Sequence, residues 1–144
     1  MEAWEPECGS LSLGQAPPSE PRANPQPPWT RPLDCIFCKI AAGDLPSERV
    51  FESPDVLVIR DIHPQAPTHL LVLPRAHVGS LDDLEDPQLA GELLLVASQV
   101  AKQAGLERGW RLITNIGVEG GQEVPHLHFH VVGGHPVGPM LSRA

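Results

Sequence analysis

The stretch His126-Leu127-His128-Phe129-His130-Val131-Val132 decides most of what can be predicted for this chain. It alternates histidine with apolar residues, and side chains on a β-strand alternate between the two faces of the sheet. The pattern therefore predicts a strand with one face in the core and a row of three imidazoles on the other. Imidazoles provide nucleophilic and acid–base groups near neutral pH.

A solvated polar face or a metal site would account for the histidine row less well. A solvent-exposed polar face would have no need of three histidines. Three ligands of one metal ion would have to lie close together, but same-face positions on a flat strand are about 7 Å apart. A reactive row of imidazoles is therefore the interpretation that we prefer.

The surrounding pattern predicts an α+β domain rather than a doubly wound parallel sheet. Strands are predicted at Val50–Glu52, Val56–Arg60, His69–Leu73, Trp110–Asn115 and Leu127–Gly133. Apolar residues recur at helical spacing over Pro87–Ala104, where Asp86 can act as the N-cap. A short helix capped by Asp34 is predicted over Cys35–Ala42. The short links between strands suggest a five-stranded antiparallel meander with the long helix packed on one face.

Composition limits the classes of partner and compartment. The chain has 144 residues and a formal net charge of −8, from 10 Lys+Arg against 18 Asp+Glu. Such a surface repels a phosphate backbone, so no nucleic-acid partner is expected. No apolar run approaches the roughly 18 residues that span a bilayer, and no signal peptide is recognised. Three cysteines do not form a secreted disulfide framework, so a soluble cytoplasmic protein is expected.

Proline is concentrated at the start of the chain, with eight of the 17 prolines in the first 34 residues. Proline removes a backbone donor and fixes φ, so residues 1–33 are predicted to be a disordered tail. A targeting or proline-recognition segment is the alternative. The working domain is predicted to cover residues 34–144.

A glycine-containing segment, Gly117-Val118-Glu119-Gly120-Gly121-Gln122-Glu123, directly precedes the histidine row. Paired glycines let backbone N–H groups approach an anion closely. Such pairs usually make ordinary turns, but beside the histidines they suggest a phosphate-binding loop.

Several separate motifs together resemble one family. The histidine row resembles the His-φ-His-φ-His-φ-φ signature (φ, apolar) of the histidine triad (HIT) superfamily. The blocks 61–74, 120–126 and 133–141 are similar to its Hint branch of purine nucleoside phosphoramidases, the last in bacterial style. The resemblance covers about Cys35 to Leu141 and implies a HIT-like fold that forms a homodimer.

The resemblance also implies an enzyme: a hydrolase of purine nucleoside 5′-phosphoramidates, including aminoacyl adenylates. The AMP- or GMP-type nucleotide would pass through a covalent nucleotidyl-histidine intermediate, with no metal needed for catalysis. By position, His128 would be the nucleophile, flanked by His130 and His69, and the carbonyl of His126 would hold the Nδ1 proton of His128. Splitting one displacement into two steps is the usual advantage of covalent catalysis.

The nucleotide-binding residues implied by the resemblance surround these histidines. Asp61 would bind the ribose, and Asn115 would lie on the phosphate side. The phosphoryl oxygens would be bound by the loop residues Gly121, Gln122 and Glu123. The base would be lined by Ile62, Ile40 and Phe37. Simpler roles are open for three of the residues: His69 as a buried core histidine, Asp61 as a turn cap, and Asn115 as an ordinary strand end.

Two departures from relatives bear on the leaving group. Glu123 stands where some relatives carry a serine that donates a hydrogen bond, which an ionised carboxylate cannot do. The C-terminus also lacks a tryptophan that some relatives use, with Met140 and Leu141 as possible substitutes.

Cys35 and Cys38 have the spacing of two thiolate ligands on one zinc ion. The resemblance adds His77 and His126 as the remaining ligands, so a structural Zn²⁺ is expected. A thioredoxin-like redox pair and two inert thiols are the alternatives. With such a site, a non-catalytic, zinc-stabilised nucleotide-binding module is the competing function for the whole domain.

Overall fold

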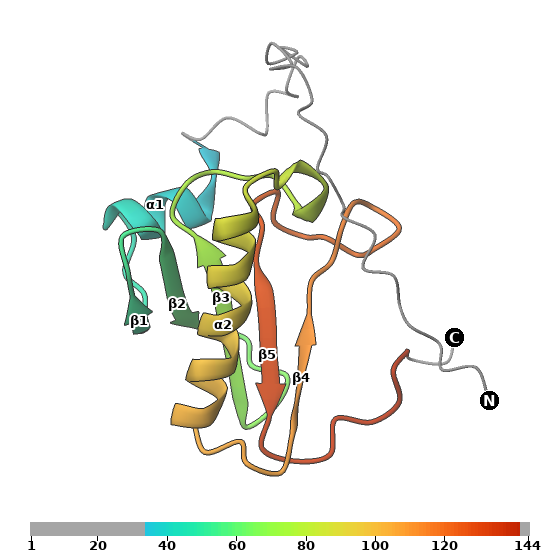
Figure 1. Ribbon diagram of the computed structural model, residues 1–144. Coiled ribbons are helices and arrows are strands. Elements are labelled where there is room, and N and C mark those ends of the chain that lie inside the picture. Colours follow the sequence, from blue (N-terminus) through green and yellow to red (C-terminus); the bar gives the residue numbers. More distant parts are fainter. Residues whose placement is uncertain (1–33, 142–144) are drawn as a thin grey trace, which may run out of the picture.

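Five strands form one antiparallel sheet in the computed structural model, which describes residues 34–141 (Figure 1). The strands are β1 (Arg49–Glu52), β2 (Val56–Arg60), β3 (Thr68–Pro74), β4 (Trp110–Ile113) and β5 (Phe129–Gly133). Helix α1 (Ile36–Ala42) precedes the sheet, a 3₁₀ turn covers Leu81–Asp83, and helix α2 (Pro87–Gln103) connects β3 to β4. The α+β class and the antiparallel sheet are confirmed. The predicted tail, residues 1–33, lies outside the described residues.

The order of the strands corrects the predicted meander. In space the order is β1-β2-β3-β5-β4, so β5 is inserted between β3 and β4. A helical crossover returns the chain to the end of the sheet where it started, so β4 runs parallel to β3. The gap between these two strands is filled by β5, which is antiparallel to both. The histidine-bearing strand is therefore interior and not at an edge.

Helix α2 covers one face of the sheet (Figure 1). Its buried side is formed by Leu93, Val96, Ala97, Val100 and Ala101, which pack on the inward residues of β2, β3 and β5. The helix begins as predicted, because the carboxylate of Asp86 accepts hydrogen bonds from the amides of Gln88 (2.9 Å) and Leu89 (3.4 Å).

Helix α1 covers only half of the opposite face. Phe37 and Ile40 pack there against Leu57, Ile59, Leu71 and Leu73 of β2 and β3. On the β5 and β4 side of the same face no helix follows within residues 34–141, so the strands form an open floor. The register places His130 of β5 opposite Leu71 of β3 and Ile113 of β4, so His130 belongs to this open face.

Two local predictions need correction. Helix α1 is capped by Cys35 and not by Asp34, because the Cys35 Sγ accepts from the amide of Cys38 at 3.4 Å. The last strand begins at Phe129 and not at Leu127. His126 and His128 therefore lie in the segment that leads into β5, and only His130 lies within the strand.

The helices within residues 34–141 fall short of a membrane span. None of them combines the length with the apolar character that crossing a bilayer requires.

Candidate active site and metal cluster

A hollow of about 730 Å³ lies over the open half of the sheet, whose strands form its base. His69 and His130 lie in it from adjacent strands, and Ile113 and Asn115 line its β4 side. Gln65, Ala66, Met140 and Leu141 line it from two loops. The two histidines that the sequence separates by 61 positions thus face a common space.

His128 is held by its backbone neighbour. Its Nδ1–H donates to the carbonyl oxygen of His126 at 2.7 Å, which leaves Nε2 as the nitrogen with a free lone pair. The ring is buried, with the edge of Phe37 against it at a centroid distance of 5.1 Å. Burial lowers the pKa of His128, which favours the neutral ring. A neutral imidazole with an unshared Nε2 lone pair can act as a nucleophile.

His130 lies next to His128, with ring centroids 5.0 Å apart. Its Nδ1 is 2.8 Å from the Nε2 of His69, whose Nε2 is also 3.4 Å from an oxygen of Asp61. Burial lowers the pKa of His130 to about 4, helped by the neighbouring His128 and His69. His130 is therefore neutral at physiological pH.

The glycine-containing loop is closed by the side chain of Gln122. Its Nε2 donates to the carbonyls of Gly79 (2.7 Å) and Val124 (3.0 Å), and its Oε1 accepts from the amide of Gly117 (3.0 Å). Both amide hydrogens are thus bonded to backbone carbonyls, and the phosphate role assigned to Gln122 gains no support from this arrangement.

The same loop leaves one backbone donor available. Among the described residues, no group accepts a hydrogen bond from the amide of Glu123. The Glu123 carboxylate is exposed and close enough to His128 to raise its pKa against the stronger effect of burial. Gly120 could not be another residue without a shift of the loop, since a Cβ there would lie 2.2 Å from the carbonyl oxygen of Ile116.

The residues expected to wall the base occupy different environments. Ile62 is exposed on the loop after β2, whereas Ile40 is on the buried side of α1, in the core against β2 and β3. Phe37 contacts the rings of His126 and His128. The Asp61 carboxylate lies at the rim, where one oxygen accepts from the amide of His63 at 2.8 Å.

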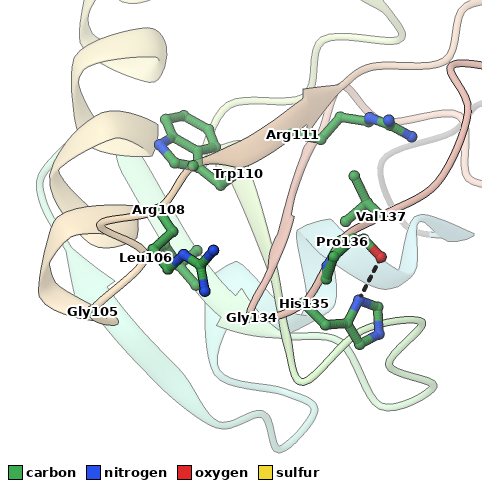
Figure 2. A pocket seen from close by; sticks show the side chains of 10 residues that line it. Gly105, Leu106, Arg108, Trp110, Arg111, Gly134, His135, Pro136 and Val137 are labelled. Carbon is green, nitrogen blue, oxygen red and sulfur yellow. Dashed lines mark hydrogen bonds between the residues drawn. The ribbon is translucent and has the colours of Figure 1, made fainter.

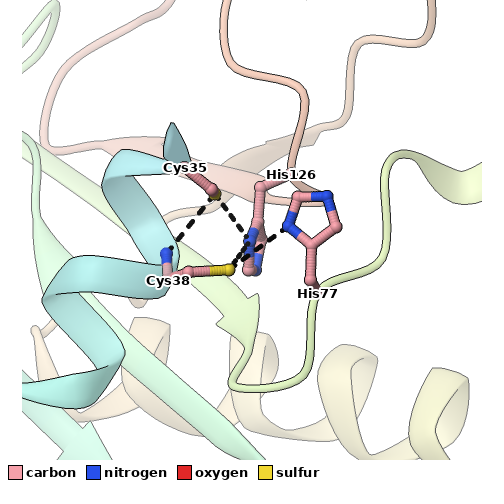
Figure 3. A group of neighbouring side chains, drawn as sticks. All are labelled: Cys35, Cys38, His77 and His126. Carbon is pink, nitrogen blue, oxygen red and sulfur yellow. Dashed lines mark hydrogen bonds between the residues drawn. The ribbon is translucent and has the colours of Figure 1, made fainter. Parts of the chain in front are cut away.

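Two cysteines and two histidines form a second cluster, which shares His126 with the histidine row (Figure 3). The Cys35 Sγ is 3.2 Å from the Nδ1 of His126, and the Cys38 Sγ is 3.2 Å from the Nδ1 of His77 and 3.6 Å from that of His126. His126 donates from Nε2 to the carbonyl of Pro74 at 2.8 Å, so its Nδ1 faces the thiols as an acceptor.

This donor set could hold a metal ion. The four donor atoms lie within 4.8 Å of one another. Tetrahedral zinc bonds to sulfur and nitrogen would separate such donors by about 3.3–3.8 Å, close to the contacts seen here. Burial and the adjacent Cys35 raise the pKa of the Cys38 thiol to about 12, so without a cation this thiol is protonated. A positive ion is the partner that would stabilise the thiolate form.

A second hollow of about 590 Å³ lies where α2 ends and β4 begins (Figure 2). Leu106, Trp110 and Pro136 line it together with Arg108, Arg111 and His135. None of the triad histidines lines it, and nothing in the sequence pattern predicts it. It adjoins the first hollow through Arg111, His135 and Val137.

Comparison with known proteins identifies the family of this arrangement. The family model described as HIT domain matches residues 42–137. The chain belongs to the HIT domain family. Its identity to the purine nucleoside phosphoramidase of Escherichia coli K12 is 44% over 113 residues, 76% of this chain and 95% of that protein. Protein HitA of Neisseria gonorrhoeae is 43% identical over 69% of this chain and 95% of its own length.

Solved HIT structures have the same fold. The HIT family hydrolase of Legionella pneumophila has a TM-score of 0.70 at 45% identity, covering 72% of this chain and 96% of that one. The HIT family hydrolase of Clostridium thermocellum has a TM-score of 0.73 at 40% identity, covering 76% and 97%. This HIT domain is thus a homologue of a phosphoramidase within a family of hydrolases.

Two groups at the HIT site were missed by the sequence analysis. The amide of Gln65 donates to the Nδ1 of His69 at 3.0 Å, and the Thr114 hydroxyl donates to the carbonyl of His128 at 2.9 Å. The first is a backbone contact, which side-chain identity does not reveal. Thr114 lies within the predicted strand Trp110–Asn115 and carries no motif that would single it out.

The buried imidazoles make the stability of this HIT domain depend on pH. The pKa values of His126 and His130 are both lowered from 6.5 to about 4, with burial as the largest cause. Below pH 6.5 these two imidazoles become protonated in the unfolded chain, whereas in the folded chain they stay neutral down to about pH 4. We therefore expect the free energy of unfolding of the metal-free protein to fall as the pH drops through this window, by up to about 1.4 kcal/mol per pH unit for each imidazole.

Urea unfolding in the presence of a chelator measures this dependence. In His130→Gln one of the two imidazoles is missing, so the dependence should be shallower. An equal slope in this variant would show that His130 does not contribute to the pH dependence of stability.

Proposed function

We propose that this HIT domain hydrolyses purine nucleoside 5′-phosphoramidates, with His128 as the nucleophile. The observation that carries the proposal is the hydrogen bond from the Nδ1–H of His128 to the carbonyl of His126, which leaves a lone pair on Nε2. The identity to a purine nucleoside phosphoramidase supports the class of substrate. The binding-module alternative has no need of a nitrogen prepared in this way.

In the first step the Nε2 of His128 attacks the α-phosphorus and the phosphorus–nitrogen bond breaks. The nitrogen leaves as an amine with a proton from solvent. In the second step a water molecule attacks the phosphorus of the nucleotidyl-histidine and the bond from phosphorus to Nε2 breaks. This releases the nucleoside monophosphate, restores the neutral imidazole and returns one proton to solvent. Two displacements at one phosphorus replace a single difficult one.

The groups around His128 stabilise charge on the phosphoryl oxygens. His130 and the Asn115 side chain supply neutral donors from the β5 and β4 sides of the hollow, and the free amide of Glu123 is a third donor, in the residue whose carboxylate acts on His128. Such donors are effective because they are already oriented before the reaction begins. His69 acts through His130. His126 contributes its carbonyl, and Gly121 gives the loop the left-handed backbone it needs, at φ 77°.

The nucleoside would bind at the α1 side of the hollow. Asp61 at the rim has one oxygen 3.4 Å from His69, and this carboxylate is the acceptor for the ribose hydroxyls. The exposed side chain of Ile62 supplies an apolar surface for the purine, whereas Phe37 and Ile40 are buried in the core between α1 and the sheet.

We expect His128→Ala to lower turnover of adenosine 5′-phosphoramidate by about a thousandfold or more, because no other group carries the nucleotidyl intermediate. AMP affinity should stay within about tenfold, since ribose, base and phosphate contacts share the binding energy. Steady-state kinetics and AMP titration measure the two effects. In His63→Ala, an exposed histidine outside the hollow, turnover should be unchanged.

Intact-mass analysis under denaturing conditions should reveal the nucleotidyl adduct on wild-type protein and none on His128→Ala. Substantial turnover by His128→Ala would remove the nucleophile assignment. AMP binding without hydrolysis by the wild type would favour the non-catalytic nucleotide-binding module.

The metal proposed for the cluster is Zn²⁺, held by Cys35, Cys38, His77 and His126. Two thiols and two imidazoles are a donor set that zinc prefers. When bound, Zn²⁺ would supply a structural cross-link between α1, the segment after β3 and the start of the histidine row. His126 already has the tautomer that a metal ligand needs. Its Nε2–H donates a hydrogen bond to the carbonyl of Pro74, so the lone pair of Nδ1 is available to the metal.

Cys35→Ser tests the metal with little disturbance of α1. Serine is a favourable N-cap, so the helix start is kept while the thiolate is lost. We expect the wild type to carry about one zinc per chain, and the variant to lose both the metal and thermal stability. Elemental analysis and thermal unfolding under reducing conditions measure both. Cys8→Ser is the matched control, and metal-free wild-type protein would contradict the proposal.

We also propose that two copies of this chain associate along β4. This strand is at an edge of the sheet, so one side of its backbone has no neighbour among the described residues. Leu112 pairs with Val131 on the α2 face and is 36% exposed. On α2, Glu92 accepts a hydrogen bond from Ser53, which follows β1, so Glu92 marks the side of the helix that faces β1. Two residues correspond to about 200° around the helix axis, so Leu94 lies on the opposite side, toward β4. The side chain of Leu94 is 49% exposed.

Leu112→Lys should halve the sedimenting mass, because a charge would be buried in the interface. Leu45→Lys is the matched control, since Leu45 has the same exposure but follows α1, away from β4. Analytical ultracentrifugation decides between the outcomes. A wild-type monomer would contradict the proposed association.

A further inference from the structure

Two neighbouring imidazoles of the site are tied to backbone groups of opposite kind. His128 donates from Nδ1 to a carbonyl, that of His126. His69, which contacts His130, accepts at Nδ1 from an amide, that of Gln65. A backbone carbonyl only accepts and a backbone amide only donates, so each contact fixes where a proton resides.

The contact with Gln65 determines the proton of His69. A nitrogen that accepts a hydrogen bond carries no proton, so Nδ1 of His69 is bare and its proton is on Nε2. That Nε2–H is 2.8 Å from the Nδ1 of His130 and 3.4 Å from an Asp61 oxygen. The carboxylate favours a proton at this place.

The proton of His130 follows from that of His69. Its Nδ1 faces an N–H at hydrogen-bond distance, so Nδ1 must accept and cannot carry a proton. The proton of a neutral His130 is therefore on Nε2. No residue within 34–141 accepts a hydrogen bond from this Nε2–H, and His130 lines the hollow.

We propose that the backbone amide of Gln65 is a positioning group: through His69 it places the proton of His130 on Nε2, toward the phosphoryl group. His128 and His130 then have opposite tautomers, so one presents a lone pair to phosphorus and the other a neutral N–H to a phosphoryl oxygen. The kinetic part of this inference rests on the proposed function. The proton placement does not.

The loop between β2 and β3 is built to hold this amide in place. Its two ends are joined, because the amide of Asp61 donates to the carbonyl of His69 at 3.0 Å. One oxygen of Asp61 accepts from the amide of His63, and the Gln65 side chain donates to the carbonyl of His63 at 3.1 Å. The loop thereby contacts both nitrogens of the His69 ring, with the Gln65 amide at Nδ1 and Asp61 at Nε2.

Gln65→Pro removes the N–H and nothing else from the contact, since proline has no backbone donor. Gln65→Ala keeps the N–H but loses the side-chain bond to His63, which Gln65→Pro loses as well, so it is the matched control for the N–H alone. Long-range ¹H–¹⁵N correlation spectra of histidine-labelled full-length protein identify the protonated nitrogen of each ring. We expect Nε2–H on His130 and Nδ1–H on His128 in the wild type and in Gln65→Ala.

In Gln65→Pro, His130 should sample both tautomers while His128 keeps Nδ1–H. We expect kcat to fall about tenfold with little change in KM, which corresponds to about 1.4 kcal/mol of transition-state stabilisation. A wild-type His130 protonated on Nδ1 would overturn the inference. So would Gln65→Pro with the wild-type tautomer and kcat.

Altered His128 signals in Gln65→Pro would reveal that this variant disturbs more than the contact with His69. In that case a second pair of variants tests the placement of the His130 proton. His69→Gln keeps an N–H donor near His130 and should preserve Nε2–H on that ring, whereas His69→Leu should not. Equal spectra for this pair would overturn the inference. If the wild type has the expected tautomers but does not hydrolyse phosphoramidates, the proposed function fails and the proton placement stands.

Discussion

The fully buried ring of His126 joins the parts of this structure on which the site depends. Its Nε2 is bonded to the end of β3, its Nδ1 faces the thiols of α1, and its carbonyl holds the ring of His128. Burial lowers its pKa to about 4, so it can serve as a neutral member of all three contacts. An isolated buried polar ring would be destabilising, and here each of its nitrogens has a partner.

The geometry of the site follows from which face of the sheet is covered. Helix α2 covers one face over β2, β3 and β5, whereas α1 reaches only β2 and β3 on the other. His69 and His130 lie on the uncovered part, in strands that are both hydrogen-bonded on each side. Reactive side chains on interior strands are held more firmly than side chains on loops.

The sequence predicted the class of fold, the histidine row and the Cys/His cluster, because alternation and ligand spacing are local patterns. It did not predict the position of β5, since the strand order depends on a helical crossover and not on any residue pattern. The sequence also could not predict the hydrogen bonds of the Gln122 side-chain amide, because its acceptors are the backbone carbonyls of Gly79 and Val124. Backbone partners of this kind have no signature in residue identity.

The open floor also bears on how the substrate range of such a domain could be redesigned. The reactive nitrogens belong to the sheet and to the segment leading into it, whereas the segment 134–141 lines the hollow from outside the sheet, with Met140 and Leu141 at its end. A graft in 134–141 would leave the hydrogen bonds of the sheet beneath unchanged. This segment is thus separable from the catalytic atoms, whereas an exchange of loop 61–67 would also replace the Gln65 amide that contacts His69.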